Sequence, residues 1–160
     1  MPGRGEHLMY AMRRWSVRHA RGLNAFYRRF EALVCWLHPL WQRIGYARLE
    51  IPVAAVERRV KGLLFDCKMC GQCVLSSTGM SCPMNCPKNL RNGPCGGVRN
   101  DGCCEVRPQM KCVWYEAISG SERIPGGTLA LGTVQPAIDR TLQGRSAWLR
   151  VARLRAGEPG

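Results

Sequence analysis

The chain has 160 residues, a formal net charge of +13 and ten cysteines, and 46% of its residues are hydrophobic. This length suits one domain of ordinary size and excludes a (β/α)8 barrel, which needs about 250 residues. The longest apolar stretch, residues 32–37, is far shorter than the about 20 residues that a membrane-spanning helix requires. A normal apolar content and five tryptophans exclude a disordered chain.

A long helical pattern opens the chain. Between Leu8 and Leu37, apolar residues recur at steps of three and four with arginines between them. We expect Gly22 to weaken the middle of this helix and Pro39 to end or kink it. Three interpretations stay open: a helix that packs on the fold, a docking helix for a partner subunit, or a helix on a membrane surface. The Arg-rich start also resembles a mitochondrial transit peptide, but the pattern continues without a break and we treat it as structure.

A second helix is predicted to begin at Pro52, because proline is tolerated at the first helical position. It leads the chain into Cys67. Its apolar residues form one face and its charged residues form another. The apolar face consists of Val53, Val56, Val60, Leu63 and Leu64, and the charged face of Glu57, Arg58, Arg59 and Lys61.

The rest of the chain divides into loops and one more helix. The cysteine-rich segment shows no sustained period and is predicted to form loops with short turns. Residues 119–127 are rich in Ser, Gly and Pro and are expected to form a linker. A last helix is predicted from about Pro136 to Arg153. Its buried residues are expected to be Ile138, Leu142, Trp148, Leu149 and Val151.

The predicted fold class is therefore mainly α with irregular loops. We expect a basic helical N-terminal region at 1–51 and a cysteine-rich metal-binding core with little regular structure at 52–118. A linker and a C-terminal docking helix are expected at 119–160.

The cysteines are concentrated in one segment. Nine of the ten lie between Cys67 and Cys112, while Cys35 in the first helix is expected to be a small buried apolar side chain. Such density indicates disulfides in a secreted domain or metal in a cytosolic one. The N-terminal residues contain no apolar core of a secretory signal, and none follows the Arg13–Arg14 pair. We therefore expect a cytoplasmic, reducing location and metal.

Three of these thiols have a spacing suited to one metal centre. Cys67, Cys70 and Cys73 form a CxxCxxC motif, which encloses a cubane iron–sulfur cluster when a remote fourth cysteine joins it. Structural zinc more commonly takes two separated CxxC pairs, or cysteine with histidine. The histidines, at positions 7, 19 and 38, all lie outside the segment. We favour iron–sulfur over zinc, alone or beside one cluster, and both over disulfides.

Several motifs in this segment resemble one family closely. They are Cys70-Gly-Gln-Cys73, Thr78-Gly-Met-Ser-Cys82-Pro, the run CPKNLRNGPCGG from Cys86 to Gly97, and Cys104-Glu-Val followed by Cys112-Val-Trp114. Together they are similar to the cysteine-rich C-terminal domain of bacterial methylenetetrahydrofolate reductases. That module also exists as a separate small subunit beside the flavin-bearing reductase in acetogens. The resemblance covers residues from about Pro52 to Trp114.

The resemblance implies an accessory iron–sulfur subunit that passes electrons to a separate flavin-containing barrel subunit in one-carbon folate metabolism. The cysteines that match those of the family are Cys67, Cys70, Cys73, Cys82, Cys86, Cys95, Cys104 and Cys112. Eight ligands suffice for two 4Fe–4S clusters, with zinc at one or both sites as the alternative. We group the CxxCxxC thiols with one distant cysteine and the remainder together. Cys103 is the spare thiol, although it can exchange roles with Cys104.

The resemblance also implies what lies elsewhere. In 160 residues we expect no barrel, no flavin and no folate pocket, so the chain is not expected to be catalytic alone. Its expected partners are the flavin-containing reductase subunit and an electron donor protein. The N-terminal helix and the tail after Gly120 are candidate docking surfaces.

The positive charge admits a second hypothesis. A zinc-stabilised structural or nucleic-acid-binding module would use it to bind phosphate. The arginines are spread over the whole chain, so we do not favour nucleic acid as a partner, nor a membrane surface. The basic residues beside the predicted ligands either favour the reduced, more negative state of the clusters, remain solvated, or dock an acidic partner. These residues are Lys68, Lys88, Arg91, Arg99 and Lys111.

Overall fold

The computed structural model describes residues 4–159, with side chains from Leu8 onward. Within that part the fold is helical with irregular loops and contains no strand, which confirms the predicted fold class. The helices are α1 (Arg4–Arg18), α2 (Ala20–Trp36), α3 (His38–Ile44), α4 (Tyr46–Phe65), α5 (Val113–Ser121), α6 (Gly127–Leu131) and α7 (Ala147–Arg155). Between α4 and α5, one 3-10 turn (Pro83–Asn85) and two isolated β-bridges interrupt the cysteine-rich loops.

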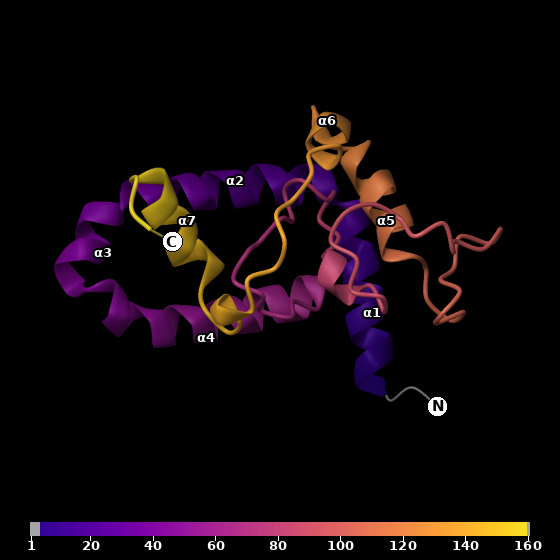
Figure 1. The fold of residues 1–160 in the computed structure, drawn as a ribbon, viewed down its shortest axis with the longest axis horizontal. Coiled ribbons are helices and arrows are strands. Elements are labelled where there is room, and N and C mark those ends of the chain that lie inside the picture. The colour runs from indigo at the N-terminus through magenta and orange to yellow at the C-terminus, as the bar shows by residue number, and fades with distance from the viewer. Residues whose placement is uncertain (1–3, 160) are drawn as a thin grey trace.

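The helices form two groups with the cysteine-rich loops beside them. Figure 1 shows α2 and α4 as two separate arms whose ends are joined by α3. Helix α7 packs against both of them, whereas α1 stands across this pair and packs against α4 and α5. The loops between α4 and α5 therefore lie against helices that come from both ends of the chain.

The N-terminal helix predicted as one element is two helices. The helical backbone is interrupted at His19, whose ring lies 2.9 Å from the Trp15 carbonyl and stacks on the Trp15 ring. Ala20 is completely buried in a cluster with Phe65 and Met80, so the chain bends where this small residue meets the core. Gly22, where we expected weakness, lies inside α2.

Three other boundaries also differ from the prediction. Helix α4 begins at Tyr46, after Gly45 with a φ of +97°, and continues through Pro52. Helix α5 extends to Ser121, into the segment expected to be a linker. The last helix begins at Ala147 rather than near Pro136, because the Ser146 hydroxyl caps it by accepting the Leu149 N–H at 3.3 Å.

The prediction for the last helix's buried residues is largely confirmed. Leu142, Trp148 and Leu149 are buried. Ile138 and Val151 are partly buried. These residues hold the C-terminal segment against the helices and the cysteine-rich loops.

Helix α4 is oriented differently from what its two-faced pattern suggests. Val56, Val60 and Leu63 are exposed, whereas Glu57 and Lys61 are each only 1% exposed. The charged pair thus faces the interior because polar and aromatic partners from α2 and α7 meet it there. None of the helices described is both long and apolar enough to cross a membrane.

Candidate metal centre

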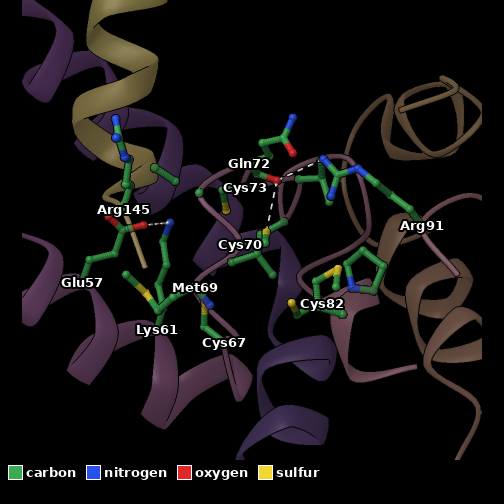
Figure 2. Close-up of a pocket in the computed structure, with 16 residues that line it drawn as sticks. Glu57, Lys61, Cys67, Met69, Cys70, Gln72, Cys73, Cys82, Arg91 and Arg145 are labelled. Atoms are coloured by element: carbon green, nitrogen blue, oxygen red, sulfur yellow. Dashed lines mark hydrogen bonds and ion pairs between the residues drawn. The ribbon is translucent and has the colours of Figure 1, made fainter. Parts of the chain in front are cut away.

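One pocket gathers four of the eight predicted ligands. Figure 2 shows it beside α4, at the point where the chain leaves this helix for the cysteine-rich loops. Its lining includes all three thiols of the CxxCxxC motif and Cys82. The cavity volume is about 20 Å³, which is room for little more than one water molecule.

The loop around this pocket depends on unusual backbone conformations. Asp66, which ends α4, has a φ of +49°, Met69 a φ of +50° and Gly71 a φ of +71°. A Cβ atom at Gly71 would lie 2.5 Å from the Leu142 carbonyl oxygen, so only glycine fits this close approach. These turns fold the CxxCxxC segment back over its own start, and the Met69 N–H donates to the Cys67 Sγ at 3.3 Å.

Burial determines the protonation of two of the four thiols. It raises the pKa of Cys67 to about 11, against the lowering effects of the Met69 N–H and Lys61. Burial also raises the pKa of Cys82 to about 12, and the charges of Cys67, Cys73 and Cys70 add to this effect. Both thiols are therefore protonated at neutral pH in the metal-free chain.

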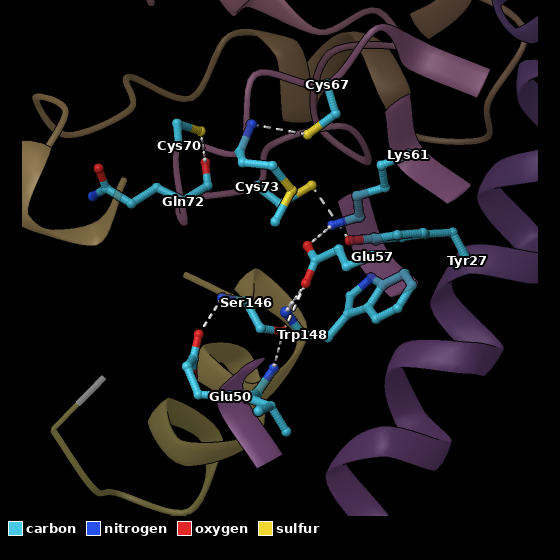
Figure 3. A network of polar contacts seen from close by, with 12 residues as sticks. Tyr27, Glu50, Glu57, Lys61, Cys67, Cys70, Gln72, Cys73, Ser146 and Trp148 are labelled. Carbon is cyan, nitrogen blue, oxygen red and sulfur yellow. Dashed lines mark hydrogen bonds and ion pairs between the residues drawn. The ribbon is translucent and has the colours of Figure 1, made fainter. Parts of the chain in front are cut away.

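A buried charged network lies directly behind the thiols. The Lys61 Nζ is 2.6 Å from the Glu57 Oε1, and both side chains line the same pocket as the four cysteines. Figure 3 shows this pair between the cysteine loop and the start of α7. The Tyr27 hydroxyl donates to the Cys73 Sγ at 3.3 Å, and burial raises the pKa of Tyr27 well above its usual value, so it remains a phenol. Burial lowers the pKa of Lys61, but its interactions with Cys73, Tyr27 and Glu57 outweigh this effect and raise the pKa well above its usual value.

Arg91 adds a second buried cation to the pocket. Its Nε donates to the Pro136 carbonyl at 2.8 Å and its Nη2 to the Gln72 carbonyl at 3.1 Å. Its Nη1 is buried without a hydrogen-bond partner. Four thiols, an ammonium and an unsatisfied guanidinium nitrogen are a donor set that fits a thiolate-held, anionic metal group.

The other four predicted ligands are less closely gathered. Cys86 and Cys104 share one apolar cluster with Met110. The Cys112 N–H donates to the Gly102 carbonyl at 3.0 Å, and the Cys104 N–H to that of Met110 at 3.0 Å, which places these two thiols on neighbouring backbone segments.

Cys95 is exposed, and its segment pairs with that of Cys104, because the Glu105 N–H donates to the Gly97 carbonyl at 3.2 Å. Its Sγ accepts the Gly97 N–H at 3.4 Å, and Glu105 and Lys88 form an ion pair beside it. Cys103, the spare thiol of the prediction, is half-buried. Its N–H donates to Asp101 at 2.9 Å.

None of the ten cysteines forms a disulfide. Cys35 is half-buried rather than fully buried. Across the part of the chain whose side chains are described, no three Cys, His, Asp or Glu side chains lie close enough together to hold a metal ion.

Sequence reasoning missed the most deeply buried cation of the site. The sequence pattern places Lys61 and Glu57 on a charged helix face, and their spacing of four residues is typical of exposed pairs. Of the five basic residues singled out beside the ligands, only Arg91 lines the pocket. Lys68 pairs instead with Asp66 at the surface. No signal in the local sequence distinguishes Lys61 from the arginines next to it.

Comparison with known proteins assigns the chain to a family. No curated protein and no solved structure matches it. The family described as "Methylene-tetrahydrofolate reductase C terminal" matches residues 46–139, more than half of the chain. This range begins with α4 and includes the whole cysteine-rich segment as well as α5 and α6. The chain therefore belongs to the methylenetetrahydrofolate reductase C-terminal family.

Proposed function

We propose that the chain is an accessory electron-transfer subunit that binds iron–sulfur clusters and passes electrons to a separate, flavin-containing methylenetetrahydrofolate reductase subunit. Family membership supports a role in folate metabolism. The observation that carries the finer proposal is the pocket that Cys67, Cys70, Cys73 and Cys82 line together with two buried cations.

The chain's own residues would hold the cluster and control its surroundings. The four thiols of the pocket would ligate it as thiolates, and Lys61 and Arg91 would compensate part of the negative charge. When bound, such a cluster supplies one-electron transfer. A reduced donor protein would supply the electrons, and the flavin of the partner subunit would accept them.

A second site would use the remaining cysteines, Cys86, Cys95, Cys104 and Cys112. The segments that carry them adjoin one another, and the exposed Cys95 would complete the site. Gly93 and Gly96 flank this cysteine, have φ values of +68° and +79°, and have no neighbouring atoms in the way of a side chain. This freedom of the backbone supports a loop that folds over the second site.

The partner subunit would dock on the outer face of α2. Phe26, Leu33 and Trp36 are exposed, and Trp36 is 75% exposed. Their spacing places them along one side of the helix, which is typical of an interaction surface. This face lies outside the matched family residues, as the N-terminal docking surface predicted from the sequence does.

The test is the metal content of the full chain purified without oxygen. We expect brown protein with about eight iron atoms and as many sulfides per chain. Cys73→Ser is expected to remove about half of the iron, whereas Cys35→Ser, outside both sites, is expected to retain all of it. Colourless, iron-free protein with stoichiometric zinc would contradict the proposal.

One observation favours a second candidate, a structural zinc site in the same pocket. The cavity of about 20 Å³ is closer to the size of a single ion than to that of a cubane cluster. In that case the same metal analysis returns zinc at the four-cysteine pocket. The chain would then stabilise the structure of the partner subunit instead of passing electrons to it.

A further inference from the structure

We infer that Lys61 is a positioning residue that supplies a fixed positive counter-charge to the four-cysteine pocket, and that Glu57 aims it. This inference rests on the proposed metal binding at Cys67, Cys70, Cys73 and Cys82. It gives two residues of α4 a role in the metal site that the cysteine motif alone does not indicate.

The burial of Lys61 is the first observation. A lysine is almost never fully buried unless its charge is compensated, yet this side chain is 1% exposed. Its Nζ lies 5.2 Å from the centre of the Tyr27 ring and 5.2 Å from that of the Trp148 ring. Two aromatic faces and one carboxylate therefore hold the ammonium at a single position.

The second observation is that Glu57 has other partners. Its Oε2 accepts the Ser146 hydroxyl at 2.7 Å and the Trp148 N–H at 3.3 Å. Both donors belong to the start of α7, where the helix dipole favours negative charge. The carboxylate charge is thus shared between Lys61 and the helix terminus, and part of the ammonium charge remains for the sulfur side.

The third observation is what lies on that other side. Lys61 lines the pocket together with the four thiols, and Tyr27, over whose ring it lies, donates its hydroxyl to the Cys73 Sγ at 3.3 Å. A 2+ metal centre with four thiolates carries a charge of about −2, which is costly to bury without cations. The order from α7 to the cysteines is therefore helix terminus, carboxylate, ammonium and cysteine sulfur (Figure 3).

The same pair also joins α4 to α7, so the experiment has to separate a counter-charge from a structural bond. The double variant Glu57→Gln/Lys61→Met removes both charges but leaves the side-chain volumes nearly unchanged and no buried charge unpaired. The matched control is Arg58→Met, which removes one exposed positive charge from the same helix.

The probe is Co²⁺ alone, titrated into the full metal-free chain without oxygen. Thiolate-to-cobalt absorption reports binding, and the site is identified by its loss in Cys73→Ser. We expect the double variant to keep its helical circular dichroism and to bind Co²⁺ at this site about tenfold or more weakly. Arg58→Met and the charge-retaining Lys61→Arg are expected to bind within a few-fold of the wild type.

Glu57→Gln alone makes the test independent of how well the double variant folds. The glutamine Oε1 still accepts the hydrogen bond from Lys61, and its Nε2 can donate to the Ser146 Oγ, so the ammonium keeps its position and faces the sulfurs without a competing carboxylate. If Lys61 supplies a counter-charge, Glu57→Gln is expected to bind Co²⁺ with an affinity equal to or above that of the wild type. A loss in this variant overturns the inference, as does wild-type affinity in the double variant. A wild type without thiolate-to-cobalt absorption would instead overturn the proposed function.

Discussion

The chemistry of the candidate site begins with the protonation of individual thiols. Only a thiolate binds metal well, so each ligand has to lose its proton. Burial raises the pKa of Cys67 to about 11 and that of Cys82 to about 12. At neutral pH both residues therefore hold a proton that a metal ion must displace, and the buried cations of the pocket stabilise the charge that remains.

This state of the thiols predicts a pH-dependent metal affinity. Since the pKa values of Cys67 and Cys82 lie above 7 in the metal-free chain, binding at pH 7 is expected to release at least two protons. Affinity then rises with pH, by about a hundredfold per pH unit for two protons. Co²⁺ titrations between pH 6.5 and 8 measure this slope, and an affinity independent of pH would show that both thiols are already ionised.

At the scale of elements, the position of the cysteine-rich loops depends on one close contact with α5. Gly79, two residues before Ser81, lies directly against this helix, and a Cβ atom there would be 2.3 Å from the Ser121 nitrogen. The Ser81 hydroxyl also donates to the Val113 carbonyl at 3.1 Å. The segment that presents Cys82 to the pocket is thereby held against the N- and C-terminal ends of α5.

Substitution of Gly79 by alanine tests this contact. Gly79→Ala combines a side chain at positive φ with overlap against α5, and we expect it to lower the free energy of unfolding by about 3 kcal/mol. The matched control is Gly93→Ala, which also has a positive φ but open space around it, and its expected loss is about 1 kcal/mol. Urea unfolding of both variants measures the difference, and equal losses would show that the loop does not depend on the contact.

Helices in which apolar residues recur every three to four positions over a long stretch could be predicted from the sequence. Their ends and orientations could not, because these depend on distant segments. The division at His19 follows from the burial of Ala20 against Phe65, which no local pattern contains. Helix α4 turns Val56 and Val60 outward because the rings of Tyr27 and Trp148 receive Lys61 on its inner side. A prediction that the apolar face of a helix points inward assumes that the helix packs against apolar residues. Here Glu57 and Lys61 point inward, because polar and aromatic side chains meet them there.

Of the candidate site, only the three cysteines of the local motif could be grouped from the sequence. The spacing of Cys67, Cys70 and Cys73 by itself identifies three thiols able to reach one centre. Cys82 joins them through irregular backbone, including Met80 with a φ of +62°, for which the sequence offers no period. The same holds for Lys61, whose burial depends on contacts across the fold.

The whole molecule has a charge that metal binding would reduce. The value of +13 counts every thiol as neutral. Two four-thiolate clusters, each of about −2, would bring the protein to roughly +9. The remaining positive charge and the exposed apolar face of α2 suit a protein partner with an acidic rim.

Electron transfer to the flavin tests the central claim most directly. The iron-loaded chain is reduced, freed of reductant and mixed without oxygen with the oxidised flavin-containing methylenetetrahydrofolate reductase subunit. Two one-electron clusters supply the two electrons that reduce a flavin, so we predict that one chain bleaches the absorbance of one flavin as its clusters are oxidised. A flavin that stays oxidised while the chain stays reduced would contradict the account.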